Sequence, residues 1–118
     1  MPTPVYTSPF TGTVVTPTDV SYYALPFSSN QELFWPSTVN GSQVPAARII
    51  DCVASSSGLS ITLPAANQGT VGADILFRNL GAYEFTVNDF EGGASFTVPV
   101  GIAKYVYLSD NTSAAGVW

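Results

Sequence analysis

Short stretches of alternating apolar and polar residues, each ended by glycine, proline, asparagine or serine, fill the second half of this chain. In residues 59–63, for example, leucine and isoleucine alternate with serine and threonine. A period of two places successive side chains on opposite faces of a β-strand. Repeated at intervals of about ten residues, such stretches are typical of an all-β sandwich or barrel. Further stretches of this kind occupy residues 74–80, 83–88, 96–100 and 103–108.

Weaker patterns in the first half predict three more strands. Residues 19–27 and 31–35 are interpreted as strands that end at Pro26 and Pro36, because proline cannot donate a hydrogen bond to a neighbouring strand. Residues 46–54 are a third, since their β-branched side chains favour an extended chain over a helical turn. No amphipathic run of about 10 to 12 residues is free of glycine and proline, so almost no helix is expected.

These patterns predict an all-β fold, an antiparallel β-sandwich or jelly-roll-like single domain over residues 18–118. A chain of 118 residues is long enough for one hydrophobic core. Residues 1–17 are rich in proline and threonine and show no periodicity, which predicts an extended N-terminal arm. Because a solvated linker would not need its large apolar residues, we expect a docking arm that contacts another surface through Val5, Tyr6 and Phe10.

The composition excludes several classes of function. The chain has no histidine, one cysteine, three basic residues and 9% charged residues, with a net charge of −5. Nucleic acids and anionic membranes are bound through lysine and arginine, so we expect neither partner. A single cysteine excludes an intrachain disulfide. Soluble domains usually carry about 25% charged residues. The low charge indicates either a surface that meets other protein subunits or one solvated by serine, threonine and asparagine.

Few residues are candidates for chemistry. Cys52 lies in an apolar run and has no histidine to activate it, so a buried structural thiol is expected. Asp89 and Glu91, and later Asp110, are interpreted as turn residues that cap their own backbone rather than as paired catalytic carboxylates. The oxygens of residues 88–92 do not have the spacing of an EF-hand calcium loop. We therefore expect no enzyme activity, no cofactor and no metal site.

Aromatic residues make up 13% of the chain. We interpret the prominent ones as packing in the core and at contacts between subunits; a row of exposed rings that stacks on sugars is the alternative. Trp118 is costly to leave in water, so either it fills the core or the native chain continues, and we expect the second. The candidate oligomer-interface aromatics are Tyr22, Tyr23, Phe34, Trp35, Tyr105 and Tyr107.

Five segments carry a resemblance to a known group of proteins: residues 61–66, 72–81, 85–89, 107–111 and 116–118. Together they resemble the β-modules of tailed-bacteriophage virion proteins, with tail fibres and their attachment domains as the nearest likeness. The stretch from residues 34–36 to 48–51 matches more loosely. The motifs are structural and include no catalytic residues.

The resemblance implies a virion structural and host-attachment module, assembled in the host cytoplasm as an obligate homo-oligomer, typically a trimer. On this hypothesis the chain is the N-terminal part of a tail fibre, and its partners are other tail or capsid proteins. Similar motifs occur in head-fibre and capsid decoration proteins, which are one alternative. A carbohydrate-binding, receptor-recognition module is another, and a glycan-degrading enzyme is disfavoured because the acid–base pair is missing.

Overall fold

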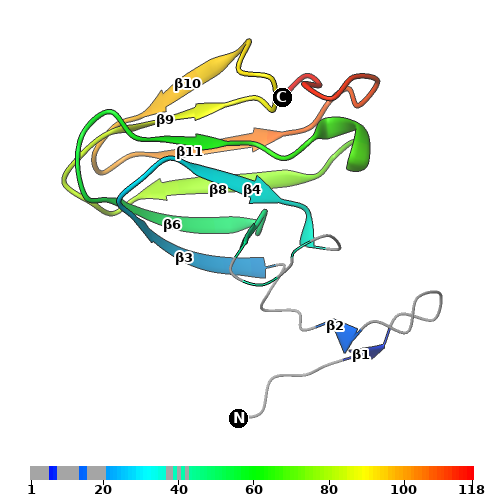
Figure 1. The fold of residues 1–118 in the computed structure, drawn as a ribbon, viewed down its shortest axis with the longest axis horizontal. Helices are drawn as coiled ribbons and strands as arrows, with labels where there is room; N and C mark the ends of the chain where they lie inside the picture. Colours follow the sequence, from blue (N-terminus) through cyan, green and yellow to red (C-terminus); the bar gives the residue numbers. More distant parts are fainter. Residues whose placement is uncertain (1–5, 8–13, 16–20, 37–38, 40, 42) are drawn as a thin grey trace.

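The computed structural model describes residues 6–7, 14–15, 21–36, 39, 41 and 43–118. Strands dominate these residues and helix is almost absent, which confirms the predicted all-β class (Figure 1). The sequence patterns do not predict β1, β2, β5 or the short 3-10 helix. In chain order the elements are β1 (Tyr6–Thr7), β2 (Val14–Val15), β3 (Tyr22–Phe27), β4 (Gln31–Phe34), β5 (Val44–Pro45), β6 (Ile49–Ala54), β7 (Ser60–Thr62), the 3-10 helix η2 (Ala66–Gln68), β8 (Asp74–Asn79), β9 (Phe85–Asn88), β10 (Ser95–Val98) and β11 (Ala103–Tyr107).

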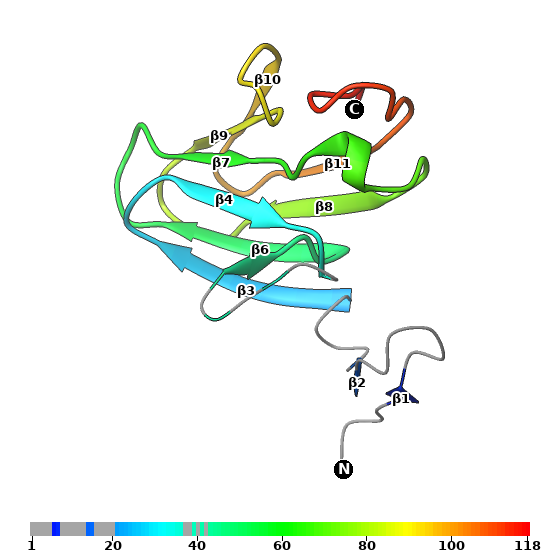
Figure 2. The same cartoon turned by 45° about the vertical axis from the view of Figure 1, so that its right-hand side comes forward.

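The strands build two main sheets that face each other (Figures 1 and 2). One sheet has five strands in the order β10-β9-β7-β4-β5, and the other has four in the order β11-β8-β6-β3. The chain passes from one sheet to the other at almost every connection, so strands that are consecutive in sequence mostly lie in opposite layers. This arrangement gives each sheet one inner face, turned toward the other sheet, and one outer face.

The expected docking arm is described only in part. β1 and β2 form an antiparallel pair that belongs to neither main sheet, with Tyr6 opposite Val15 and Thr7 opposite Val14. Of the three residues expected to dock, only the backbone of Tyr6 is described. Val5 and Phe10 lie outside the described residues, so the role of the arm stays a prediction.

Most neighbouring strands run parallel, so the expected antiparallel order is wrong and both sheets are mixed. β3, β6 and β8 are parallel in one sheet, and β5, β4, β7 and β9 are parallel in the other. β10 and β11, each at the edge of a sheet, run antiparallel to their neighbours. Alternation is typical of antiparallel sheets, but the parallel strands here have one buried and one outer face and therefore show the same pattern.

The parallel pairs arise because the chain winds repeatedly between the two sheets. Tyr22 pairs with Ile49 and Ile49 with Leu76, a step of 27 residues each time (22 to 49, 49 to 76). Each turn of the winding adds one parallel strand to the four-stranded sheet. β10 and β11 then add to the last edge of each sheet and run antiparallel to β9 and β8. Residues one step apart therefore stand side by side on the same face of the sheet.

Prolines occupy the edge strands at the start of the winding. Pro26 lies inside β3, and Pro45 ends β5, and these are the outermost strands of their sheets. Proline has no N–H to donate, so it is tolerated where one side of the strand is unpaired. The strand predicted over residues 19–27 does end at Phe27, but Pro26 lies inside it and does not terminate it, because an edge strand needs no donor on its free side.

The hydrophobic core lies between the two sheets. Phe27 of β3 meets Phe85 of β9 edge to face, with ring centroids 5.7 Å apart, and Phe77 of β8 meets Phe96 of β10 at 6.3 Å. Aromatic pairs in this geometry add to the stabilisation from burial itself. Trp118, which was expected either to fill the core or to precede further chain, packs against this core. Other fully buried side chains are Leu33, Ile50, Ile61, Leu63, Ile75, Val87, Val98 and Leu108.

One buried polar side chain ties the end of the four-stranded sheet to the five-stranded sheet. The amide nitrogen of Asn79 donates to the carbonyl oxygens of Tyr83 (2.9 Å) and Val98 (3.0 Å). Its Oδ1 accepts the N–H of Gly81 (3.0 Å), and the side chain is 2% exposed. Asn79 thus satisfies three backbone groups where the chain leaves β8, in a place from which water is excluded.

Asn79→Ala is expected to lower the free energy of unfolding by about 3 kcal/mol, because an unsatisfied buried polar group costs about 1–3 kcal/mol. Urea unfolding followed by tryptophan fluorescence measures the change. Asn67→Ala, at an exposed position of η2, is the control and should stay within about 0.5 kcal/mol of the wild type. A midpoint for Asn79→Ala equal to that of the control would contradict this role.

Candidate functional site

The outer face of the four-stranded sheet carries an apolar row. Tyr22, Ile49, Leu76 and Tyr105 occupy matching positions on β3, β6, β8 and β11. Tyr22 is 47%, Ile49 38% and Tyr105 60% exposed, while Leu76 is half-buried between its neighbours. Val53, on the same side of β6, is also exposed. Large apolar side chains gathered on one exposed face indicate a surface that binds another molecule. We call this surface the four-stranded face.

A carboxylate holds the tyrosine at one end of the row. The hydroxyl of Tyr22 donates to Asp51 Oδ2 (2.7 Å), and Arg78 Nε lies 2.7 Å from Asp51 Oδ1. Asp51 and Arg78 are register partners on β6 and β8, in the row adjacent to the apolar one. The hydrogen bond to Asp51 raises the pKa of Tyr22, because the bond is lost when the hydroxyl ionises.

The other end of the row repeats this arrangement. The hydroxyl of Tyr105 donates to Asp74 Oδ2 (2.6 Å), and Arg48 Nε lies 3.1 Å from Asp74 Oδ1. The bond from Tyr105, followed by that from Arg48, lowers the pKa of Asp74. The same bond to Asp74 raises the pKa of Tyr105. Two clusters, each of a tyrosine, an aspartate and an arginine, therefore flank Ile49 and Leu76.

The charges on the four-stranded face cancel. Asp51 is paired with Arg78 and Asp74 with Arg48, and these two arginines are among only three basic residues in the chain. The net charge of −5 is therefore carried by the rest of the chain. Exposed ion pairs contribute little to stability. Their main effect here is to hold the polar groups of the face in fixed positions with their charges compensated.

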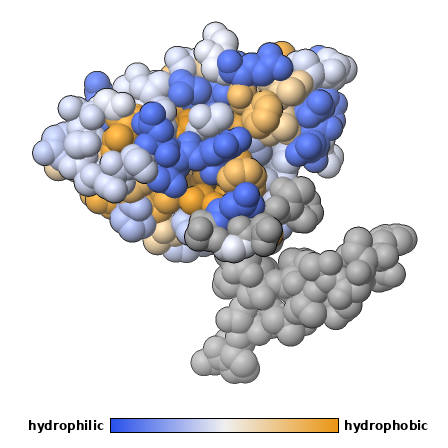
Figure 3. Space-filling view, viewed as in Figure 1, coloured by the Kyte–Doolittle hydropathy of each residue, from blue (hydrophilic) through white to orange (hydrophobic). Residues whose placement is uncertain are grey.

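The outer face of the five-stranded sheet, which we call the five-stranded face, has a different chemistry. Its positions on β7, β9 and β10 hold small hydroxyl and amide side chains. Such side chains are readily solvated and offer little apolar area for a partner. Over the surface that Figure 3 presents, hydrophilic residues separate the hydrophobic ones. The small polar residues are Ser60, Thr62, Thr86, Asn88, Ser95 and Thr97.

Three of the six aromatics expected at an oligomer interface are exposed on the four-stranded face. Tyr22 and Tyr105 end the apolar row, and Tyr107, 55% exposed, lies beside Asp74 on the neighbouring strand. The structure places these three residues on one face, although β3 and β11 are far apart in sequence and lie at opposite edges of the sheet. Their exposure leaves both the interface and the sugar-stacking interpretations available to this face.

The other three aromatics, Tyr23, Phe34 and Trp35, are partly buried within the domain. Tyr23 and Trp35 pack against the core. The indole of Trp35 stacks on that of Trp118, with ring centroids 6.2 Å apart, and its Nε1 donates to the carbonyl oxygen of Ala65 (2.7 Å). Trp35 therefore serves packing within one chain, and it is not presented on an outer face.

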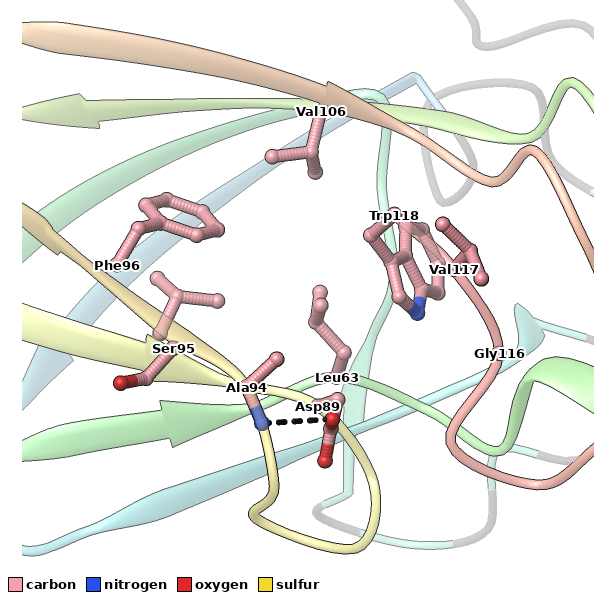
Figure 4. Close-up of a pocket in the computed structure, with 10 residues that line it drawn as sticks. Leu63, Asp89, Ala94, Ser95, Phe96, Val106, Gly116, Val117 and Trp118 are labelled. Atoms are coloured by element: carbon pink, nitrogen blue, oxygen red, sulfur yellow. Dashed lines mark hydrogen bonds between the residues drawn. The ribbon is translucent and has the colours of Figure 1, made fainter.

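A cavity of about 320 Å³ lies where β9 and β10 approach the C-terminal segment. Figure 4 shows Phe96 and Trp118 at opposite sides of this cavity, with Val106 and Leu63 between them. Among the described residues, Asp89 is the one titratable group in a mostly apolar lining. The indole Nε1 of Trp118 is buried there without a hydrogen-bond partner. The cavity holds space for a small apolar group and no pair of catalytic groups.

The two carboxylates with the clearest turn signals do hold turns. The carboxylate of Asp110 accepts the N–H (2.8 Å) and the hydroxyl (2.6 Å) of Thr112, which lowers the pKa of Asp110. Asp89 caps the turn after β9, and Figure 4 shows one of its bonds. These bonds assign the Asp89 carboxylate to the turn. It accepts, at 2.9 to 3.0 Å, the N–H groups of Glu91, Gly93 and Ala94.

Cys52 is fully buried in the core, where a structural thiol was expected. Burial raises the pKa of its thiol to about 12, so the group is protonated at neutral pH and a poor nucleophile. Within the described ranges no group of three or more histidine, cysteine, aspartate or glutamate side chains is placed to hold a metal ion. The same ranges contain no helix of the length and hydrophobicity needed to cross a bilayer.

The Cys52 thiol is expected to resist dithiobis(nitrobenzoic acid) in the native chain at about pH 8, because only an accessible thiolate attacks this reagent. After unfolding in guanidinium chloride, one thiol per chain should react at once. The absorbance of the released thionitrobenzoate measures both reactions. Fast reaction of the folded chain would show that the thiol is reached from solvent.

Tyr105→Phe is expected to raise the pKa of Asp74 toward the ordinary aspartate value of about 3.9, because it removes the strongest of the hydrogen bonds that favour the carboxylate. The carboxyl ¹³C chemical shift of Asp74, followed by NMR over an acid titration, reports this pKa. Tyr107→Phe is the matched control on the same strand and should leave it unchanged. An unaltered pKa in Tyr105→Phe would show that the bond is not kept in solution.

The same bond defines a pH range for the contribution of this cluster to stability. Because the pKa of Asp74 is lowered in the folded chain, its contribution is present above the unfolded-state pKa and is lost as the pH falls through the folded value. Because the pKa of Tyr105 is raised, its contribution is complete below the unfolded-state pKa and is lost as the pH rises through the folded value. Tyr105→Phe should therefore weaken the pH dependence on both the acid and the alkaline side.

No protein-family model, curated protein or solved structure matches this chain. The resemblance of its motifs to phage β-modules accordingly stays an expectation from sequence. Function is to be inferred from the features of the molecule itself: two unlike outer faces, a small apolar cavity and carboxylates that serve turns. Of these, the four-stranded face combines exposure, apolar area and ordered polar groups.

Proposed function

We propose that this chain is a non-catalytic structural and adhesion module of a bacteriophage virion. In this proposal it is the N-terminal part of a tail fibre, assembled in the host cytoplasm, that anchors the fibre to the tail or capsid. The observation that carries the proposal is the contrast between the ordered, neutral four-stranded face and the hydroxyl-rich five-stranded face. On a chain with 9% charged residues, an apolar face of this kind is suited to lasting contact with protein.

The proposal includes self-association. The module acts as a homo-oligomer, a trimer if it follows the fibres that its motifs resemble, and its two facing sheets work as one sandwich-like unit. The exposed apolar row supports association, because a lone copy in water would leave Tyr22, Ile49 and Tyr105 uncovered. The arm over residues 1–17 makes the contact with other tail or capsid proteins through Val5, Tyr6 and Phe10.

Carbohydrate binding is a second candidate function, and the exposed tyrosines of the four-stranded face favour it. Tyr22, Tyr105 and Tyr107 present aromatic rings on one side of the molecule, with Tyr22 beside Asp51 and Tyr105 beside Asp74. Aromatic rings stack on the apolar faces of sugars, and charged groups bind sugar hydroxyls. A receptor-recognition module would use the face in this way.

Sedimentation velocity of the whole chain over a range of micromolar concentrations tests the first function. We expect an oligomer, with a trimer at three times the 12.4 kDa of one chain. Deleting residues 1–11 should leave the number of chains in the oligomer unchanged, because the described main sheets begin at Tyr22 and the arm is assigned to other partners. Loss of association in the truncated chain would instead assign self-association to the arm.

A glycan array tested with the same preparation separates the two functions. The structural module should bind no glycan above background. A monomeric chain that binds a defined sugar, and loses that binding in Tyr107→Ala, would favour receptor recognition and contradict the structural proposal.

A further inference from the structure

The four-stranded face has the properties of a contact between identical subunits. We infer that copies of this chain pack on one another through this face, with Tyr22, Ile49, Leu76 and Tyr105 buried at the centre of the contact. The inference rests on the proposed self-association and adds the surface and the residues that carry it. The cavity beside Trp118 offers no comparable site, because its lining is mostly apolar and its one acidic side chain, Asp89, is bonded to its own turn.

The polar groups of the face are prepared for burial. A charged group is costly to remove from water unless it is paired and hydrogen-bonded. The side chains of Asp51 and Asp74 are already only 12% and 19% exposed, and each is bonded to an arginine and a tyrosine of its own chain. Covering the face therefore leaves each carboxylate paired with an arginine, Asp51 Oδ1 through the ion pair alone and without a hydrogen bond. The fixed side chains lose little further freedom.

The same pairing disfavours other classes of ligand. Nucleic acids and anionic lipids need cations that are not yet neutralised, whereas Arg48 and Arg78 are engaged by carboxylates of their own chain. A sugar needs free hydrogen-bond donors around the aromatic rings, but the hydroxyls of Tyr22 and Tyr105 already donate within the face. What the face still offers is apolar area with a compensated polar rim, which suits a protein surface.

A second copy supplies the surface that this face requires. Outside the four-stranded face, each copy carries the whole net charge of −5. The four-stranded face of a second copy is instead neutral and apolar at its centre. The side chains of Arg48 and Arg78 are 72% and 46% exposed. Each guanidinium is held by a carboxylate of its own chain, so contact with the neutral face of another copy brings no net repulsion. The same face on each copy can therefore meet further copies around a symmetry axis.

Three of the four edge strands of the main sheets, β3, β5 and β11, carry a residue that opposes the addition of another strand, whereas β10 does not. Edge strands can add a strand from another chain through their free backbone groups. The edge strands β3 and β5 contain Pro26 and Pro45. Proline removes an N–H donor that pairing with a strand of another chain would use. Lys104 lies on β11, the other edge of the four-stranded sheet, where its charge opposes the same kind of addition. The apolar row is thus the surface best suited to join copies.

Two variants that each add one positive charge to an outer face provide the test. Leu76→Lys lies at the centre of the four-stranded face, and Thr97→Lys lies at an exposed position of β10 on the five-stranded face. Sedimentation velocity of each whole-chain variant over a concentration series gives its association constant. We expect Leu76→Lys to weaken association about tenfold or more and Thr97→Lys to leave it unchanged. Far-ultraviolet circular dichroism and thermal unfolding confirm that each variant is folded.

If Leu76→Lys does not fold, the association constant of Ile49→Lys, at a more exposed position of the same row, is measured in its place. Association equal to wild type in the folded face variants overturns the assignment of the face and leaves self-association standing. Equal weakening by Thr97→Lys also overturns it, since the effect is then not specific to this face. A wild-type chain that stays monomeric at every concentration overturns both the face and the proposed self-association, and points to a different protein as the occupant.

Discussion

Stacking of parallel strands in register, at a step of 27 residues, is the constraint on which the rest of this structure depends. It aligns Tyr23, Ile50 and Phe77 on the inner face of the four-stranded sheet and, with the same register, Ile49 and Leu76 on the outer face. A slip of one residue in a strand would exchange its inner and outer side chains. The core and the candidate functional face are therefore specified by one and the same register, and neither can change alone.

The positions of the strands could be predicted because the burial of alternate residues is recorded locally in the sequence. β8 and β11, for instance, lie within the predicted stretches 74–80 and 103–108. The direction and neighbours of a strand depend on the path of the whole chain, and here that path crosses to the other sheet between one parallel strand and the next. The 27-residue step does leave a trace in three apolar pairs: Tyr22–Tyr23 begins β3, Ile49–Ile50 begins β6, and Leu76–Phe77 lies inside β8.

The candidate face shows the same division between local and long-range information. Tyr22 and Tyr105 were identified from sequence as interface residues, but their partners Asp51 and Asp74 were not, because 29 and 31 residues separate the members of each pair. Such partners become visible only when the strand order is known. The turn role of Asp89 was predictable, since the backbone groups that it binds follow within five residues.

The winding also bears on how the chain folds. The hairpin of β9 and β10 pairs Thr86 with Thr97 across one short turn, whereas β3 finds β6 only after a step of 27 residues. Contacts between residues close in sequence form sooner, because less chain entropy is lost in closing the loop between them. A nascent chain makes β3 long before its neighbours exist, and β11, which completes the row that ends in Tyr105, is made last. Copies of the chain that meet through the four-stranded face, as we propose, can then do so only after β11 has been made and has joined β8.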